Sequence, residues 1–348
     1  MELNDLTSLV SSDTDLTSAQ AAAAADLLAS AEVEVEAKAK FLTALAEKGE
    51  SSSEVAGLAG RFRELARDPG LSEWQDQAID VCGTGGDKQG TFNVSTTVTY
   101  VIAAAGIPVF KHGNRSITSK CGSANLLDAL GVDLMADDAV LKKAMAELGF
   151  CFMFAPAFHP AFKEIMPVRQ KLAEQGQRTV FNILGPLINP AKPSYQLLGV
   201  FGKQVVELMA GAQHELGLKA GLVAHCDLGE KGGMDEFSVA GTNIARGFGS
   251  LREVDKSATA ADLGLAAGEL SDLEGGDVVE NKEILAKLLE GKAPKALEDT
   301  VVLNTAAAFF VHGRHGSIQA GYEEARDLLL GGKTHAKIDQ TRDFYASL

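Results

Sequence analysis

The sequence predicts an α/β fold, in which a large domain with a mostly parallel sheet flanked by helices is joined to a small all-helical domain. Two observations support this prediction. Residues 1 to about 70 have helical patterns throughout. From about residue 78, short apolar runs alternate with helical patterns, as in parallel strands joined by crossover helices. The chain has 348 residues, which suits one large domain or two unequal ones.

In the N-terminal part, apolar residues at helical spacing predict helices in residues 17–30, 35–49 and 51–66. Two of these helices begin with a capping box, formed by Thr17 with Gln20 and by Ser51 with Glu54. The stretch ARDPG then interrupts the pattern. We therefore expect a small domain over residues 1–76, completed by helices around residues 160–192, and a large domain over residues 77–348.

In the large domain, the apolar runs predict strands at residues 78–82, 107–110, 150–155, 196–201 and 220–226. The helical patterns between them cover residues 95–106, 123–131, 137–149, 159–173 and 203–217. Ligands of such sheets bind beyond the carboxyl ends of the strands. Side chains that follow a strand directly are therefore the candidates for a site.

The formal net charge of −15 excludes broad binding of nucleic acid or of anionic membranes, so an anionic ligand needs a local basic pocket. No apolar run is long enough to span a bilayer, and the acidic N-terminus has no signal-peptide core. The cysteines fit no zinc site and indicate reduced thiols of a cytoplasmic protein; they are Cys82, Cys121, Cys151 and Cys226.

The stretch DVCGTGGDKQGTFNVST, residues 80–96, predicts an anion-binding loop between a strand and a helix. Its four glycines let the backbone approach a ligand closely. The amides at the start of the helix, for which Asn93 is the candidate N-cap, are free to bind phosphate. A tight turn alone needs fewer glycines. The loop is neither a P-loop, which needs GxxxxGK[ST], nor a dinucleotide fingerprint, because Lys88 replaces its third glycine.

Three further stretches are candidates for the same site. KHGNRSITSK, residues 111–120, has no acid and supplies the basic pocket that the net charge demands. The adjacent carboxylates Asp235 and Glu236 suit Mg²⁺ held together with substrate phosphates, although an acidic surface turn is the better explanation of them in isolation. Arg169, expected two residues past a kink at Pro167 in a helix from Pro160, can reach into a cleft, although a surface arginine is the usual outcome.

Taken together, these segments resemble the anthranilate phosphoribosyltransferase family. The resemblance depends on GTGGD with TFNVST, KHGNR, APAFHPA, RTVFNILGPLINPA and the Asp-Glu pair, in that order over residues 78–240. It implies transfer of a phosphoribosyl group from phosphoribosyl pyrophosphate (PRPP) to anthranilate, which gives phosphoribosyl-anthranilate and pyrophosphate in tryptophan biosynthesis. It also implies a homodimer, and the small-residue helix face of residues 19–30 is the candidate interface within residues 1–70.

The resemblance assigns PRPP-binding positions to Gly83, Gly86, Asp87, Thr91, Asn93, Val94, Ser95, Thr96, Lys111, His112, Gly113, Asn114, Arg115, Ser116, Ile117, Thr118, Ser119 and Ser123. It assigns two magnesium ions to Ser95, Asp235 and Glu236, and anthranilate to Gly83, Asn114 and Arg169. No general base is evident: His112 lies in the right stretch, but a neutral hydrogen-bonding role fits it equally well.

The chain departs from the family pattern at three places. Cys121 and Asn125 replace the usual Ser and Asp, and the segment HCDLGEKGG before Asp235 is longer than expected. Two other functions remain open at this point. A pyrimidine nucleoside phosphorylase of the same fold would need no acidic metal pair, and a non-catalytic nucleic-acid-binding relative would need a broad basic face.

Overall fold

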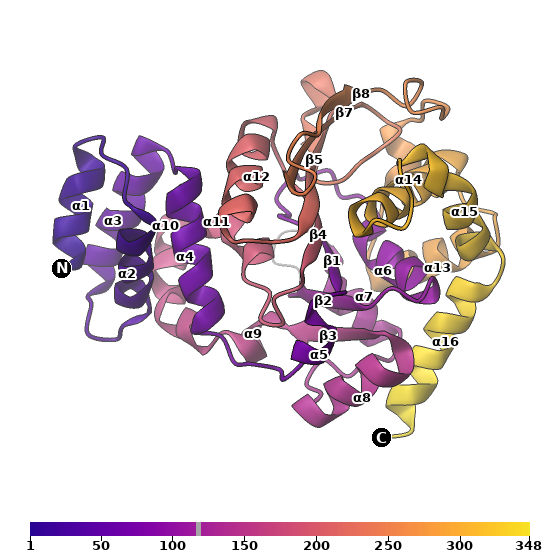
Figure 1. The fold of residues 1–348 in the computed structure, drawn as a ribbon, viewed down its shortest axis with the longest axis horizontal. Helices are drawn as coiled ribbons and strands as arrows, with labels where there is room; N and C mark the ends of the chain where they lie inside the picture. Colours follow the sequence, from indigo (N-terminus) through magenta and orange to yellow (C-terminus); the bar gives the residue numbers. More distant parts are fainter. Residues whose placement is uncertain (116–119) are drawn as a thin grey trace.

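A computed structural model describes residues 1–115 and 120–348. Three layers of structure lie side by side in it (Figure 1): a helical bundle that holds the N-terminus, a central sheet, and a group of C-terminal helices on the far side of the sheet. Among the described residues, no helix has the length and the apolar character needed to cross a bilayer. The predicted fold class is thus confirmed.

The bundle is built from α1 (Leu3–Ser11), α2 (Ser18–Ala29), α3 (Val35–Lys48) and α4 (Ser52–Glu64), together with α10 (Met166–Glu174) and α11 (Phe181–Leu184). Both predicted capping boxes are formed, since the Thr17 and Ser51 side chains accept bonds from the third amide of α2 and α4. Side chains of all six helices share one apolar core, which continues onto α12 (Val206–Glu215) and one face of the sheet.

One face of the alanine-rich helix α2 packs inside this bundle. Part of the small-residue face that we expected at a dimer interface is therefore buried within one chain, whereas Ala19 is exposed and Ala22 is half-buried. Ala21, Ala24 and Ala25 are fully buried in the single chain. Gly57 of α4 lies so close to α2 that a Cβ there would overlap the Ser18 carbonyl oxygen. The small residues therefore allow close packing of α2 against α4 within one molecule.

The sheet has the strand order β3-β2-β1-β4-β5-β7-β8, and β6 pairs with β5. The strands are β1 (Ile79–Gly83), β2 (Val109–Gly113), β3 (Phe150–Phe154), β4 (Tyr195–Gly199), β5 (Ala220–Asp227), β6 (Gly233–Met234), β7 (Thr242–Gly249) and β8 (Asp255–Ala258). The pairs from β3 to β5 are parallel, whereas β6, β7 and β8 are attached by antiparallel pairs, which the apolar runs did not predict.

The opposite face of the sheet is covered by α6 (Val94–Ala104) and by a C-terminal group (Figure 1): α13 (Val278–Leu289), α14 (Lys295–His312), α15 (Tyr322–Leu330) and α16 (Lys333–Ala346). The helices α7 (Ser123–Ala129) and α8 (Asp138–Leu148) connect β2 to β3. The sequence prediction left the C-terminal group undescribed. α14 is buried almost all round, so its pattern lacks the polar stripe of a surface helix.

The expected single helix over residues 159–173 is wrong. The chain instead forms α9 (Ala155–Phe158), a 3₁₀ turn (Pro160–Glu164) and then α10, which begins at Met166. Pro167 is in the first turn of α10, where the amide that proline lacks has no partner in the helix. Pro167 therefore starts a new helix rather than bending an existing one.

Candidate active site

The glycine-rich loop leaves the sheet where the strand order reverses, between β1 and β4. Gly83 at the end of β1 is paired with Gly199 at the end of β4. The Thr84 amide donates to the Gly199 carbonyl at 3.0 Å, and the Thr84 hydroxyl accepts from the Phe201 amide at 3.0 Å. In a doubly wound sheet, this reversal point is where a crevice opens beyond the carboxyl ends of the strands.

Three carboxylates meet at this point. Oδ2 of Asp235 accepts a 2.6 Å hydrogen bond from the Gly85 amide. Burial, reinforced by the charge of Asp87, raises the pKa of Asp235 to about 7. Burial, with the charges of Asp235 and Asp87, likewise raises the pKa of Glu236, which also bonds to Thr91. Among the described residues, no hydrogen-bond partner reaches Oδ2 of Asp87 or Oε1 of Glu236.

The predicted magnesium ligands Ser95, Asp235 and Glu236 line one small cavity. About 10 Å³ of it is open to the centre of a water molecule, which is room for one water or one small cation. Within residues 1–115 and 120–348, no three His, Cys, Asp or Glu side chains are arranged to hold a metal on their own. Mg²⁺ needs no such cage, because it usually keeps water and takes substrate phosphates as ligands. The buried, unpaired carboxylate oxygens fit such an ion.

Two glycines and one asparagine fix the acidic pair in place. A Cβ on Gly83 would overlap Oδ2 of Asp235, and a Cβ on Gly199 would overlap the Asp235 carbonyl oxygen. Asn304 of α14 accepts from the Phe237 amide at 3.1 Å and donates to the Phe237 carbonyl at 2.7 Å. Sequence analysis missed Asn304. The one feature of the sequence that could have indicated it is the presence of a polar residue within a long apolar helix. The segment before Asp235 is a hairpin of β5 and β6, which accounts for its unexpected length.

At the start of α6, the predicted PRPP positions are mostly buried. Val94 and Thr96 are 1% exposed, and the Thr96 hydroxyl finds no partner among the described residues. Asn93 is at the N-cap position, but its side chain makes no capping bond. It donates instead to the Cys121 carbonyl at 3.1 Å.

Lys111 does not face the loop in this structure, although we expected a cation there. It is 1% exposed, and its Nζ donates to the carbonyl of Val81, in the middle of β1, at 2.8 Å. Burial lowers the pKa of Lys111, and the charge of the buried Asp80 acts in the opposite direction. The burial of Lys111 follows from its place in the sheet. Lys111 is the central residue of β2 and is paired with Phe152 of β3, so its side chain starts from within the sheet and not from the loop.

His112 forms a buried pair with His159, with 3.1 Å between their Nε2 atoms. Burial, with the neighbouring charges of His159 and Lys111, lowers the pKa of His112 well below its usual range. Burial lowers the pKa of His159 to about 4. Both rings are therefore neutral near pH 7, and the lowered pKa makes each a weak proton acceptor, which favours the hydrogen-bonding role for His112 over a role as a base.

The loop that follows β2, which we call the second loop, lies close to α7. A Cβ on Gly113 would be 2.5 Å from Oγ of Ser123, so this glycine lets the helix start approach the strand. Asn114 is exposed, and its side-chain oxygen accepts from the Arg115 amide at 2.7 Å. The Arg115 guanidinium is paired with Asp128 at 2.8 Å. The predicted positions Ser116, Ile117, Thr118 and Ser119 lie outside the described residues.

Arg169 is a partly buried cation near an aromatic ring. Its guanidinium lies 5.7 Å from the centre of the Phe181 ring, and burial lowers its pKa. Among the described residues, no carboxylate pairs with it. Sequence analysis missed Arg178, which lies over Phe201 at 4.4 Å and donates to the Gly86 carbonyl at 3.5 Å. Its only signal was its place within the motif RTVFN.

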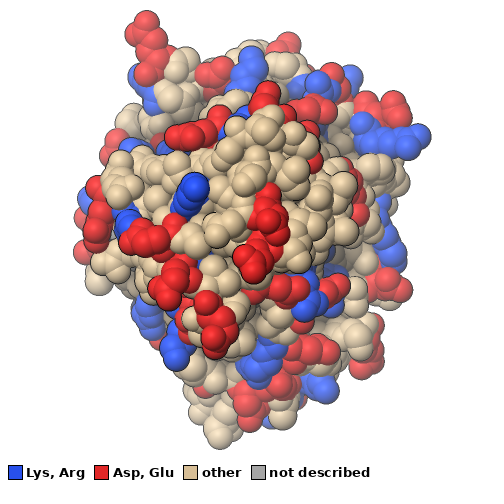
Figure 2. Space-filling view, turned by 90° about the vertical axis from the view of Figure 1, so that its left-hand side faces the viewer, with Lys and Arg blue, Asp and Glu red and all other residues tan. Residues whose placement is uncertain are grey.

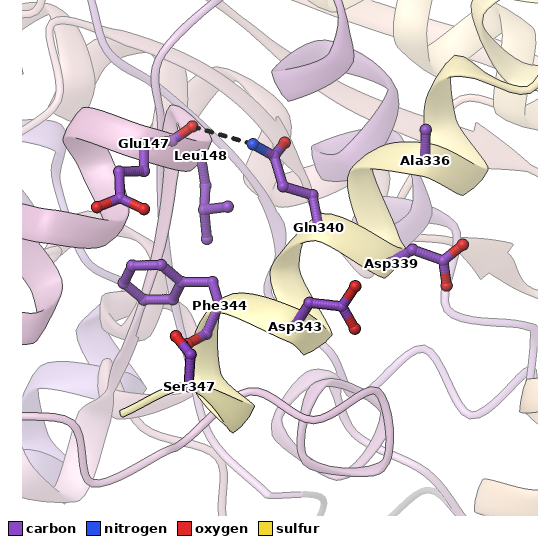
Figure 3. A pocket seen from close by; sticks show the side chains of 8 residues that line it. All are labelled: Glu147, Leu148, Ala336, Asp339, Gln340, Asp343, Phe344 and Ser347. Atoms are coloured by element: carbon purple, nitrogen blue, oxygen red, sulfur yellow. Dashed lines mark hydrogen bonds between the residues drawn. The ribbon is translucent and has the colours of Figure 1, made fainter.

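A wider hollow of about 580 Å³ lies between α8 and α16 (Figure 3). Its lining includes the carboxylates of Glu147, Asp339 and Asp343, and Gln340 reaches across it to the Glu147 carbonyl at 3.4 Å. An acidic lining does not suit an anionic ligand. The smaller crevice at the glycine loop is therefore the better candidate site.

Both parts of the chain match family models. Residues 5–66 match the helical bundle domain of a glycosyl transferase family, and residues 75–335 match its a/b domain. The fold and the site thus define a member of this glycosyl transferase family.

Individual relatives narrow the family further. An anthranilate phosphoribosyltransferase of Pelodictyon phaeoclathratiforme is 38% identical over 310 residues, 89% of this chain and 87% of the relative. One of Deinococcus radiodurans is 42% identical over 292 residues, 84% of each chain. The crystal structure of the enzyme from Thermus thermophilus superposes with a TM-score of 0.89 at 37% identity, covering 98% of this chain and 99% of the other.

A further solved relative was captured with ligands. The Saccharomyces cerevisiae anthranilate phosphoribosyltransferase in complex with PRPP and Mg superposes with a TM-score of 0.81 at 25% identity, covering 99% of this chain and 98% of the other. The chain belongs to the anthranilate phosphoribosyltransferase family.

Proposed function

We propose that this protein transfers the phosphoribosyl group of PRPP to the amino group of anthranilate and releases pyrophosphate. The reaction is the second step from chorismate in tryptophan biosynthesis. The observation that supports it best is the meeting of the glycine-rich loop with three partly buried carboxylates, marked by the 2.6 Å bond from the Gly85 amide to Asp235. A loop that binds phosphate next to acids that need a cation suits a magnesium-bound pyrophosphate.

For PRPP, we propose that the glycine-rich loop and the segment after β2 form the two sides of the site. The loop contributes Gly83, Gly86, Asp87, Thr91, Asn93, Val94, Ser95 and Thr96. The other side contributes Lys111, His112, Gly113, Asn114, Arg115, Ser116, Ile117, Thr118, Ser119 and Ser123. Backbone amides at the loop supply donors, which suits a chain in which Lys111 is buried and Arg115 is paired with an acid.

For magnesium, we propose two ions held by Ser95, Asp235 and Glu236 together with PRPP. The cavity that these residues share, which has room for one small cation, and the unpaired oxygen of Glu236 support one ion at these residues; the second ion is proposed from the family resemblance. Bound Mg²⁺ supplies charge stabilisation for the departing pyrophosphate. Without a cation, the pKa of Asp235 and of Glu236 is raised, because burial and the neighbouring carboxylates disfavour negative charge at this site.

For anthranilate, we propose a pocket formed by Gly83, Asn114 and Arg169. A buried carboxylate needs a charged or hydrogen-bonding partner, and a guanidinium matches its two oxygens. Arg169 suits this role because it is partly buried and unpaired among the described residues, and because it comes from α10 of the helical bundle and not from the PRPP loops.

The chemistry then depends on orientation and on departure of the leaving group. An aromatic amine is a weak nucleophile, so the two substrates must be held with the amine facing C1 of the ribose. The glycine-rich loop holds the leaving group and α10 holds the acceptor. The neutral His112 and His159 can donate or accept a hydrogen bond without adding charge, and we assign no general base.

We further propose a homodimer that associates through residues 1–70. Figure 2 shows the end of the molecule formed by the helical bundle, where a broad uncharged area is surrounded by acidic side chains and scattered basic ones. We divide the chain into a helical domain of residues 1–76, completed by the helices around 160–192, and a large domain of residues 77–348. A cytoplasmic location is supported by the four cysteines, none of which forms a disulfide.

The test of this function is turnover of anthranilate with PRPP, followed by the fluorescence of anthranilate as it is consumed. Activity that requires Mg²⁺ supports the proposal. Phosphorolysis of a pyrimidine nucleoside without anthranilate turnover would instead establish the phosphorylase alternative. Tight binding of a nucleic acid at physiological salt, again without turnover, would establish the non-catalytic one.

A further inference from the structure

The segment from Leu273 to Asn281, which we name the brace, lies along the glycine-rich loop although it is distant in sequence. The Phe92 amide donates to the Leu273 carbonyl at 2.9 Å, and the Gly275 amide donates to the Gly90 carbonyl at 2.9 Å. Between these bonds, Thr91 and Glu274 form an isolated antiparallel bridge. The backbone of the brace thus pairs with the loop over three successive residues.

The approach is so close that it depends on a glycine in the brace. A Cβ on Gly275 would be 2.8 Å from the Thr91 carbonyl oxygen and 2.9 Å from the Phe92 Cα. Both neighbours are backbone atoms, which cannot move aside as a flexible side chain can. The glycine therefore sets the distance between the brace and the loop.

Asn281, in the first turn of α13, is the side chain that connects the brace to the site. It is 1% exposed. Its oxygen accepts from the Gly276 amide at 3.0 Å, and its Nδ2 donates to the Gly276 carbonyl at 3.1 Å. The same Nδ2 donates to Oδ1 of Asn93 at 3.1 Å. Asp277 caps α13 by accepting from the amides of Val279 and Glu280, so the base of Asn281 is held firmly.

Asn93 then carries this connection to the second loop. Its Nδ2 donates to the Cys121 carbonyl at 3.1 Å, two residues before Ser123. The orientation of both amides follows from their backbone partners, because a carbonyl must face Nδ2 and an amide must face Oδ1. Hydrogen bonds therefore connect α13 to the start of α7 through Asn93 and also directly, because Asn281 bonds to the Cys121 side chain as well. The helices α13 and α7 pack together at this point (Figure 1).

We propose that Asn281 is a positioning residue for PRPP, which acts through Asn93 by setting the distance between the two loops of the binding site. This inference rests on the proposed function, because it uses the assignment of PRPP to both loops. Asn281 itself does not touch the substrate. Its bond to Oδ1 of Asn93 holds that side chain in the one orientation that reaches Cys121. Without it, Asn93 is free to turn and the loops lose their fixed separation.

Two variants of Asn281 test the donor role. Asn281→Asp keeps the shape and the acceptor for the Gly276 amide but loses both donor bonds, to Asn93 and to the Gly276 carbonyl, and Asn281→Ala removes all three of these bonds. We expect each to raise the KM for PRPP by about 10-fold, as for loss of one buried hydrogen bond. The KM for anthranilate should change less than the KM for PRPP, because Arg169, the charged group of the anthranilate pocket, is on another element, while Gly83 and Asn114 belong to both sites.

A double-mutant cycle tests whether Asn281 acts through Asn93. If it does, Asn93→Ala combined with Asn281→Ala raises the KM for PRPP no more than the larger of the two single changes. Independent, multiplying effects would overturn the proposal, because they would mean that the two residues act separately.

Asn243 offers a matched control. Its side chain closes a turn of the same size, accepting from the Ser238 amide and donating to the Ser238 carbonyl, each at 2.8 Å. Asn243→Ala should therefore lower the thermal stability as much as Asn281→Ala while leaving the KM for PRPP within about twofold of the wild type. Equal changes in this KM for the two variants, or an unchanged KM with a loss of kcat alone in Asn281→Ala, would show a merely structural role and overturn the inference.

Calorimetric titration of PRPP with Mg²⁺ separates this inference from the proposed function. A wild type that binds PRPP but does not consume anthranilate would overturn the proposed function alone. The dissociation constants of the same variants would then decide the role of Asn281 by the same criteria. A wild type that does not bind PRPP would overturn both.

Discussion

The Nε2 atoms of His112 and His159 lie 3.1 Å apart in the buried wall that joins β2 to the segment after β3. Only one of the two facing nitrogens can carry a proton in this contact, because one must donate and the other accept. The ring of His159 also lies edge-on against Phe162. The pair is therefore a neutral link in an apolar wall, and acid must disrupt it.

This arrangement predicts a pH dependence of stability. The pKa of His159 is lowered from 6.5 to about 4, so between these values the unfolded chain binds a proton that the folded chain does not. Its contribution is fully present above pH 6.5 and is lost as the pH falls toward 4, at about 1.4 kcal/mol per pH unit. The free energy of unfolding, measured in urea at a series of pH values, should rise less steeply with pH in His159→Gln than in the wild type. The difference between pH 4 and 6.5 should correspond to nearly one proton. Parallel slopes for variant and wild type would contradict the prediction.

Asp235 should be essential for metal-dependent catalysis. Asp235→Ala removes a group proposed to hold the ion that stabilises the departing pyrophosphate, so kcat should fall roughly 10²-fold or more. Excess EDTA should abolish turnover by the wild type. Asp339→Ala, in the acidic hollow between α8 and α16, is the control and should leave kcat unchanged. Full turnover in EDTA would exclude the metal role.

Arg169 should determine the affinity for anthranilate and not for PRPP. Charged hydrogen bonds contribute about 1.5 to 3 kcal/mol, so Arg169→Ala should raise the KM for anthranilate by roughly 10- to 150-fold. The KM for PRPP should change much less. Lys171→Ala removes a cation from the same helix that is already paired with Glu36, and should move neither value. If the KM for PRPP rose more than the KM for anthranilate, Arg169 would belong to the phosphate site.

Gly199 should tolerate no side chain, because it supports the acidic pair. A Cβ there would overlap the Asp235 carbonyl oxygen, so the backbone before Glu236 must shift. Gly199→Ala should destabilise the fold by about 1 to 3 kcal/mol and lower kcat at least about 10-fold. Gly185→Ala is the control, since among the described residues no atom outside its own chain neighbours and helix backbone lies within 4 Å of its Cβ position. A Gly199→Ala enzyme with wild-type melting temperature and kcat would contradict the placement of this strand end.

The proposed dimer predicts a mass of two chains in solution. Light scattering at micromolar concentration should give twice 36.5 kDa. A charged residue introduced into the uncharged area at the end of the bundle (Figure 2) should shift the equilibrium toward the monomer without unfolding the chain. A monomer at these concentrations would count against association through residues 1–70.

The sequence by itself determined those features that local chemistry controls. Alternating strands and helices predict a parallel sheet, and the capping boxes at Thr17 and Ser51 predict the starts of two helices. The glycine-rich loop after β1 indicates an anion site, because glycines and free amides at a helix start are local properties. The candidate metal ligands Ser95, Asp235 and Glu236, taken from motif resemblance, do line one cavity.

Only the tertiary structure decided which side chains are buried and which partners they meet. Lys111 looks like a phosphate-binding cation in sequence but is buried against Val81. Ala21, Ala24 and Ala25 of α2 look like part of an open interface but are buried within the bundle. Asn281 reaches Asn93 across 188 residues of chain. Burial and hydrogen-bond partners are set by segments far apart in sequence, so no local pattern contains them.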